Sequence, residues 1–277
     1  MKWPRASEGL SVDPGADTTW ASGPKLVTEP TAVAVDASGT ARACGSRAVL
    51  VAARRGSGLR LTRPFTAMSI VDPLLTRTYL RWVIETAGCG RLRVPLMVVV
   101  PAVADSEAGG WRELAESIGV RPLVVERPVA AVVGLGLDDV SGAAQMVVDA
   151  EHEGTETAVV VDGVVVGARH SPPLSKGLRA TAAAVRSLLV SIDPDHELDI
   201  ADRGINLVGR QMADMRLAGA LGERVGLAIN VPDDPGRVVI EGARRTMETM
   251  RPYLPAVLSR RVRRRPSFKA ARGGSAR

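Results

Sequence analysis

Residues 145–167, QMVVDAEHEGTETAVVVDGVVVG, contain three short apolar runs separated by two turns. The run MVVD ends at Asp149, TAVVV follows the loop AEHEGTE, and VVVG follows Asp162-Gly163. Asp-Gly is the dipeptide that best suits a two-residue hairpin turn, and the Val-rich runs have the composition of strands. The stretch therefore predicts strands joined by hairpins in the middle of the chain.

The loop between the first two strands joins them as a phosphate-binding turn would, but its charges are wrong for phosphate. Such a loop needs glycines, because its backbone N–H groups must approach the phosphate oxygens. Here Glu151, His152 and Glu153 precede the single Gly154, and two carboxylates would repel a polyphosphate. The segment is either an ordinary acidic hairpin loop or a nucleotide loop that has lost its nucleotide chemistry.

Composition favours an α/β protein. The chain has 277 residues, of which 45% are hydrophobic and only 3% aromatic, so Val, Leu, Ala and Ile must build the core. This length allows one large domain or two small ones. The strand and helix patterns alternate after each hairpin region, which predicts two βα layers that share a cleft rather than a single doubly wound sheet.

The positive net charge is concentrated in the last eighteen positions, 260–277. They contain eight of the basic residues and no acidic one, which leaves 28 basic against 30 acidic residues elsewhere. The body is therefore not a nucleic-acid-binding surface by charge. The tail could attract anionic lipid headgroups, act only as a solubilising segment, or bind nucleic acid. The candidate contact residues in it are Arg261, Arg263, Arg264, Arg265, Phe268 and Lys269.

Metal sites and export signals are not indicated. Cys44 and Cys89 have no CxxC spacing, and the three histidines are dispersed, so we expect no metal ligand set. No run of eighteen apolar residues occurs, and the N-terminus lacks the apolar core of a signal peptide. We therefore expect a cytoplasmic protein.

Six segments resemble one family in order and at nearly the family's spacing. They are TEPTAVAV (28–35), LTRPFTAMSIVD (61–72), VVVPAV (98–103), VVERPVAAVVGLGL (124–137), VVDAEHEGTETAVV (147–160) and residues 205–248, which include INLVG, VPDDP and VVIEGA. Together they resemble the MreB/Mbl-type bacterial actin homologues of the actin, Hsp70 and sugar-kinase superfamily. The resemblance implies an actin-like (ribonuclease H-like) two-domain α/β fold and a cytoskeletal protein involved in cell shape and cell-wall morphogenesis.

The resemblance also places the remnants of a nucleotide site. SVDPGADTT (11–19) is similar to the family's first phosphate loop, with Asp13 and Gly15 retained, although Pro14 removes a backbone donor. The second loop keeps Asp149, Gly154 and Thr155, while acidic residues and a histidine stand where the family has glycines. The third keeps only Gly209, followed by Arg210.

The family's catalytic carboxylate aligns with Arg127, directly after Glu126. A guanidinium stays protonated at physiological pH and cannot accept a proton from an attacking water. Arg127 is then either a surface or salt-bridged arginine at a helix start, or a positive group that fills an empty phosphate site. We expect no confident catalytic residue and no cofactor, with ATP and magnesium as the ligands if the site still binds any.

The second half looks truncated. Only 58 positions separate Asp149 from Leu207, where family members insert a whole subdomain. We expect an N-terminal segment with the first loop remnant (1–27), a first actin-like half (28–140), a truncated second half (141–256) and a disordered basic tail (257–277).

The expected role is that of a non-hydrolysing adaptor or regulator. Its partner would be a full-length MreB-type relative or the wall-synthesis machinery, and the tail would hold it at the inner face of the cell membrane. The alternatives are a slow ATPase that uses Asp13, Glu126 and Asp149, and a nucleic-acid binder driven by the tail.

Overall fold

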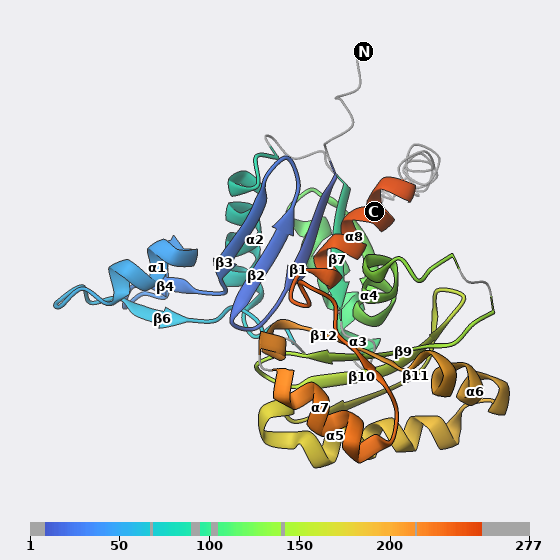
Figure 1. Cartoon of the computed structure of the whole chain (residues 1–277). Helices are drawn as coiled ribbons and strands as arrows, with labels where there is room; N and C mark the ends of the chain where they lie inside the picture. Colours follow the sequence, from blue (N-terminus) through green and yellow to red (C-terminus); the bar gives the residue numbers. More distant parts are fainter. Residues whose placement is uncertain are drawn as a thin grey trace, which may run out of the picture.

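The computed structural model describes residues 9–66, 69–89, 95–100, 105–139, 142–213 and 215–250. In the first half a five-stranded sheet has the order β3-β2-β1-β7-β8 (Figure 1). Strands β1, β2 and β3 form an antiparallel meander, and β7 and β8 run parallel to β1. The strands are β1 (Leu10–Pro14), β2 (Thr18–Ser22), β3 (Leu26–Pro30), β7 (Pro95–Val100) and β8 (Arg121–Glu126).

The second half repeats this topology in the order β11-β10-β9-β12-β13. Its first three strands are again an antiparallel meander, and its last two run parallel to the first of them. They are β9 (Gln145–Ala150), β10 (Thr155–Val161), β11 (Val164–Ser171), β12 (Ile205–Val208) and β13 (Ile229–Asn230). The two sheets arrange equivalent strands in the same order, which confirms the expected α/β architecture of two halves.

The hairpin between β10 and β11 forms at the predicted dipeptide. Asp162 and Gly163 have φ values of 48° and 74°, so both central residues adopt the left-handed conformation that a type I′ turn requires. The first half also contains a hairpin, because β4 (Val33–Val35) pairs antiparallel with β5 (Ala41–Cys44).

Helices cover the outer face of each sheet. On the first sheet, α2 (Pro73–Thr86) and α3 (Asp105–Ser117) bury an apolar face that includes Leu80, Val83 and Trp111. Helix α2 begins where the sequence supplies both a cap and a proline: the Asp72 carboxylate accepts hydrogen bonds from the N–H groups of Leu74 and Leu75, and Pro73 follows it directly. On the second sheet, α5 (Leu174–Ser191) and α7 (Met215–Val225) form the corresponding layer.

Two helices lie between the sheets and share one apolar core. They are α4 (Arg127–Leu135), which contacts strands of both sheets, and α8 (Val238–Met250), which packs on α4 and on strands of the first sheet. Their close approach depends on glycine, because a Cβ on Gly134 would overlap the carbonyl of Val238, and one on Gly242 the carbonyl of Ala130. The halves are therefore joined by tight helix packing on this side.

A small third sheet extends from the first half only (Figure 1). It contains β4, β5 and β6 (Arg60–Thr62), covered by α1 (Gly45–Ala52), and it is inserted between β3 and α2. In the second half, residues 172–204 hold helices α5 and α6 (Pro194–Arg203) and no strand. The second half therefore lacks the smaller subdomain, as expected from its length.

Several sequence expectations need adjustment or fall outside the described residues. Helix α6 begins after Asp193, whose carboxylate accepts a hydrogen bond from the N–H group of Asp195 and caps the helix. Strands β1 and β2 lie before residue 27 and pair within the first sheet, whereas the domain boundaries themselves stay predictions. The basic tail and its six candidate contact residues lie outside the described residues. Among the described residues, no helix is both long and apolar enough to cross a membrane.

Candidate functional site

The two central strands bring equivalent aspartates to the cleft between the halves. Asp13 lies near the end of β1 and Asp149 near the end of β9, the same place in the two repeated sheets. Both are almost fully buried, with exposed fractions of 2% and 1%. Because ionised carboxylates rarely remain buried without partners, their surroundings define the chemistry of the cleft.

Arg127 is the partner that both aspartates share. It is the first residue of α4, directly after β8, and its side chain is only 6% exposed. One guanidinium nitrogen pairs with Asp13, and the other lies 3.0 Å from Oδ2 of Asp149 and 3.7 Å from Oε1 of Glu151. Arg127 is therefore a buried, salt-bridged side chain and not a surface arginine.

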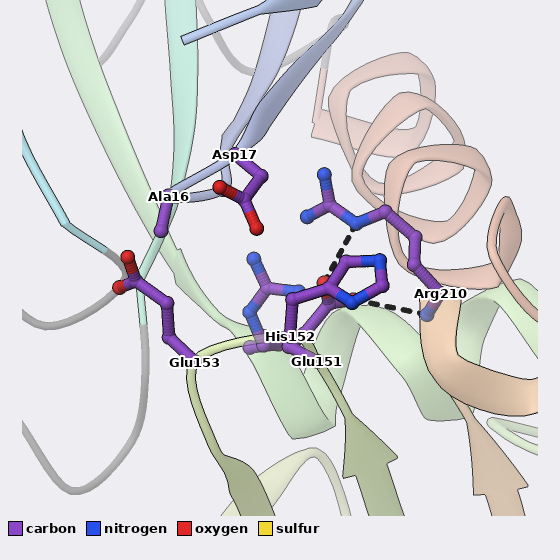
Figure 2. Close-up of a pocket in the computed structure, with 8 residues that line it drawn as sticks. Ala16, Asp17, Glu151, His152, Glu153 and Arg210 are labelled. Carbon is purple, nitrogen blue, oxygen red and sulfur yellow. Dashed lines mark hydrogen bonds and ion pairs between the residues drawn. The ribbon is translucent and has the colours of Figure 1, made fainter. Parts of the chain in front are cut away.

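Arg210 completes the arrangement from the other half. It starts the short 3₁₀ helix η1 (Arg210–Ala213) after β12. Its Nε lies 2.7 Å from Oε2 of Glu151, a pair that Figure 2 shows, and its Nη2 lies 3.5 Å from Oδ2 of Asp13. A third guanidinium nitrogen donates to the carbonyl oxygen of Thr18. We call Asp13, Arg127, Asp149, Glu151 and Arg210 the cleft network.

Electrostatics in the network follow from three carboxylates facing two guanidiniums. Burial and the nearby Asp149 raise the pKa of Glu151 to about 7, although Arg210 and Arg127 oppose this shift. Burial alone would lower the pKa of Arg127, but the charges of Asp13, Asp149 and Glu151 outweigh it and raise that pKa above its usual range. The arginine therefore stays charged, and Glu151 takes up a proton at a higher pH than an exposed glutamate does.

The retained glycines are places where this chain contacts itself. A Cβ on Gly15 would overlap the Arg210 guanidinium, and one on Gly154 would overlap the imidazole of His170. Gly209 has φ 102°, and a Cβ there would overlap the Asp149 carboxylate and the Ala150 carbonyl. The space in front of these glycines is occupied by side chains and backbone.

A shallow cavity remains at the rim of the cleft. About 270 Å³ of empty space, which includes open solvent, is lined by Gly15, Ala16, Asp17, Arg127, Glu151, His152, Glu153 and Arg210. Figure 2 shows the side chains of Asp17, Glu151, Glu153 and Arg210 around this space, so its lining carries both acidic and basic groups.

The fold brings most of the sequence-predicted site residues together. Asp13, Gly15, Asp149 and Gly209 meet at the cleft together with Arg127. Thr155 is fully buried at the start of β10, and Glu126 ends β8 half-buried without capping α4 through its side chain. The functional roles of these residues stay predictions.

Sequence reasoning missed the pairing of Glu151 with Arg210. Both residues were noted only as replacements of glycine in two different loops. The available signal was a new acid and a new base at two loops that the resemblance places around one ligand. Among the described residues, no group of three or more His, Cys, Asp or Glu side chains is arranged to hold a metal ion.

Comparisons with known proteins agree with the fold. The family model described as "MreB/Mbl protein" matches residues 8–173. The cell shape-determining protein MreB of Pasteurella multocida is 24% identical over 327 aligned positions, which cover 87% of this chain and 93% of that protein. MreB of Escherichia coli K12 is 31% identical over 173 positions, which cover 57% of this chain and 50% of that protein.

Solved structures show the same architecture. MreB5 of Spiroplasma citri bound to AMPPNP superposes with a TM-score of 0.79 at 15% identity, covering 92% of this chain and all of that one. A non-polymerising mutant of MamK bound to AMPPNP gives a TM-score of 0.67 at 17% identity, covering 88% of this chain and 100% of that one. The likeness establishes an actin-like fold, and with the match to the family model it shows that this chain belongs to the MreB/Mbl family.

Proposed function

We propose that this protein is an MreB-type actin-like cytoskeletal protein of cell shape and wall morphogenesis that works without hydrolysing ATP. The observation that carries this proposal is the position of Arg127. Its guanidinium lies between Asp13 and Asp149, 3.0 Å from the latter, at the residue where the family's water-polarising carboxylate is expected. A guanidinium there can neither accept a proton nor bind a cation.

The residues present also do not fit magnesium and a nucleotide as they are arranged. Hard cations such as Mg²⁺ bind through carboxylate oxygens, and in this cleft each carboxylate of the network is paired with at least one arginine. The glycines that would let a backbone approach phosphate face the chain's own side chains. We therefore derive no catalytic step through a nucleotide.

The role that follows is that of an adaptor or regulator. The partner would be a full-length MreB-type relative or the wall-synthesis machinery, and the basic tail would hold the protein at an anionic membrane surface. A pull-down from the native cell, with and without residues 257–277, tests both parts. If both forms recover an MreB-type relative or wall-synthesis proteins, the adaptor role is supported. If neither form recovers any such protein, the adaptor role is refuted.

A slow ATPase is the second candidate, because MreB5 and MamK were both solved with AMPPNP and because Asp13 and Asp149 are retained here. Two measurements separate the candidates: phosphate release, and thermal unfolding with and without Mg-ATP. A ligand held at about 100 times its Kd adds ~2.7 kcal/mol, or about 5 °C for a chain of this size.

We expect no shift and no phosphate release from the wild type. A shift of that size that disappears in Asp149→Ala, together with turnover, would establish the ATPase instead. Binding to RNA or DNA that falls steeply with salt, without binding to anionic vesicles, would favour the nucleic-acid alternative.

A further inference from the structure

Ion pairs cross the cleft in both directions. We call the half built on the β1 sheet the first lobe and the half built on the β9 sheet the second lobe. Arg127 of the first lobe pairs with Asp13 of its own lobe and, at 3.0 Å, with Asp149 of the second. Arg210 of the second lobe pairs at 2.7 Å with Glu151 of its own lobe and at 3.5 Å with Asp13 of the first. Each guanidinium therefore links the lobes.

A further contact crosses at the rim of the cleft. Arg63 follows β6 in the first lobe and pairs with Asp17 of that lobe. Its other terminal nitrogen lies 3.6 Å from Glu153 of the second lobe. Because the Arg63 side chain is 57% exposed, this link is screened by solvent, whereas the Arg127 and Arg210 side chains are only 6% and 11% exposed.

The lobes are thus fastened at two separate places. On one side α4 and α8 pack through Gly134 and Gly242, and at the cleft the buried network spans the gap. Charges in a buried site interact more strongly than charges in water, and removing one partner leaves the other without compensation. Opening the cleft would strip each buried carboxylate of a guanidinium, so the network opposes opening.

We propose that the cleft network is a built-in clamp that holds the two lobes closed with no ligand between them, so that closure of this protein does not depend on a nucleotide. The inference deepens the proposed function, because it assigns to side chains the position that a nucleotide would otherwise bridge. The predicted consequence is that the protein keeps one closed conformation, whether or not a nucleotide is present.

Distances between labels on the two lobes test this clamp. Ala37, in the turn between β4 and β5, and Ala201, in α6, are exposed and lie on opposite lobes. Cysteines introduced by Ala37→Cys and Ala201→Cys accept spin labels, whose separation is measured by pulsed electron–electron double resonance. The native thiols are buried, and burial raises the pKa of Cys44 to about 11, so labelling at pH 7 favours the introduced sites.

We expect a single narrow distance distribution for the full chain, unchanged by Mg-ATP. Adding Arg210→Ala should increase the mean distance between the labels by more than the width of the wild-type distribution. It should also broaden the distribution. Arg244→Ala is the matched control, since it removes an arginine whose partners Glu241 and Glu248 lie on its own helix. Arg63→Ala, which removes only the exposed link, should give a smaller change than Arg210→Ala.

Each outcome decides the inference. If Arg210→Ala melts below the measuring temperature, Arg210→Gln is used, because it keeps a polar side chain of similar reach. A closed distribution in both Arg210 variants, or a wild-type distribution that Mg-ATP shifts, overturns the clamp. If the wild type releases phosphate while its distance distribution stays narrow and unchanged by Mg-ATP, the non-hydrolysing function is refuted and the clamp stands. If the wild type releases no phosphate but both Arg210 variants keep the closed distribution, the clamp is refuted and the non-hydrolysing function stands.

Discussion

Replacing Arg127 by methionine should destabilise the protein strongly, although the change keeps most of the side-chain volume. Asp13 and Asp149 are 2% and 1% exposed, and the substitution removes the cation that both of them contact. Breaking a buried ion pair by deleting one partner costs ~3–5 kcal/mol, because the other charge stays in the interior without compensation. For a chain of this size, 1 kcal/mol shifts Tm by about 2 °C, so we expect a loss of about 6–10 °C.

Thermal unfolding followed by circular dichroism at pH 8 and at pH 5 is the assay. At pH 5 Glu151, whose pKa is raised to about 7, carries a proton and the cleft holds one negative charge fewer, so the loss should be smaller than at pH 8. Arg244→Met is the control: its side chain is 37% exposed and pairs within α8, so the expected change is below about 1 kcal/mol. A Tm loss for Arg127→Met no larger than that of the control, or an equal loss at both pH values, would refute the reasoning.

Three further predictions follow from the same geometry. The pKa of Glu151 is raised from 4.5 to about 7 by burial, so the stability from its protonation is complete below pH 4.5 and is lost as pH rises through 7. Thermal melts at several pH values should therefore show that Tm falls between pH 4.5 and 7 in the wild type. The Tm of Glu151→Gln should change less over the same range. Gly242→Ala places a Cβ on the Ala130 carbonyl and should cost more than ~2 kcal/mol by chemical denaturation, whereas Gly219→Ala, which meets nothing within 4 Å, should be neutral or slightly stabilising. Arg127→Glu adds a carboxylate to the network and should make Tm rise with Mg²⁺, an effect absent from the wild type; equal responses to Mg²⁺ in both proteins would contradict it.

Local chemistry explains which parts of the fold could be predicted from the sequence. The hairpin at Asp162-Gly163 follows from the conformations that those two residues tolerate, and the start of α2 follows from its cap and proline. The two-half architecture followed from alternating strands and helices and from the family resemblance. The packing of α8 against the first sheet could not be read from its own residues, because an amphipathic helix does not specify which sheet covers its apolar face.

The sequence predicted which residues lie at the candidate site but not how their side chains are arranged. The resemblance placed Asp13, Asp149 and Gly209 near one another, and they do meet. It left the environment of Arg127 open, because Arg127 and Asp13 are 114 positions apart and whether their side chains touch depends on how the lobes close. Burial and pairing are properties of the assembled cleft, and single-residue patterns carry no information on them.

The assembled cleft changes how the departures from the family are understood. Taken separately, Glu151 and Arg210 each stand, by the resemblance, where the family has a glycine in one of two phosphate loops. In the structure Nε of Arg210 lies 2.7 Å from Oε2 of Glu151, and both residues belong to one network with Arg127, which aligns by the resemblance with the family's carboxylate. Unconstrained decay of a nucleotide site would place unpaired charges in a buried cleft at a cost of several kcal/mol. The charges of the cleft network are instead opposite in sign and mutually paired, which agrees with the proposed clamp that holds the cleft closed without a ligand.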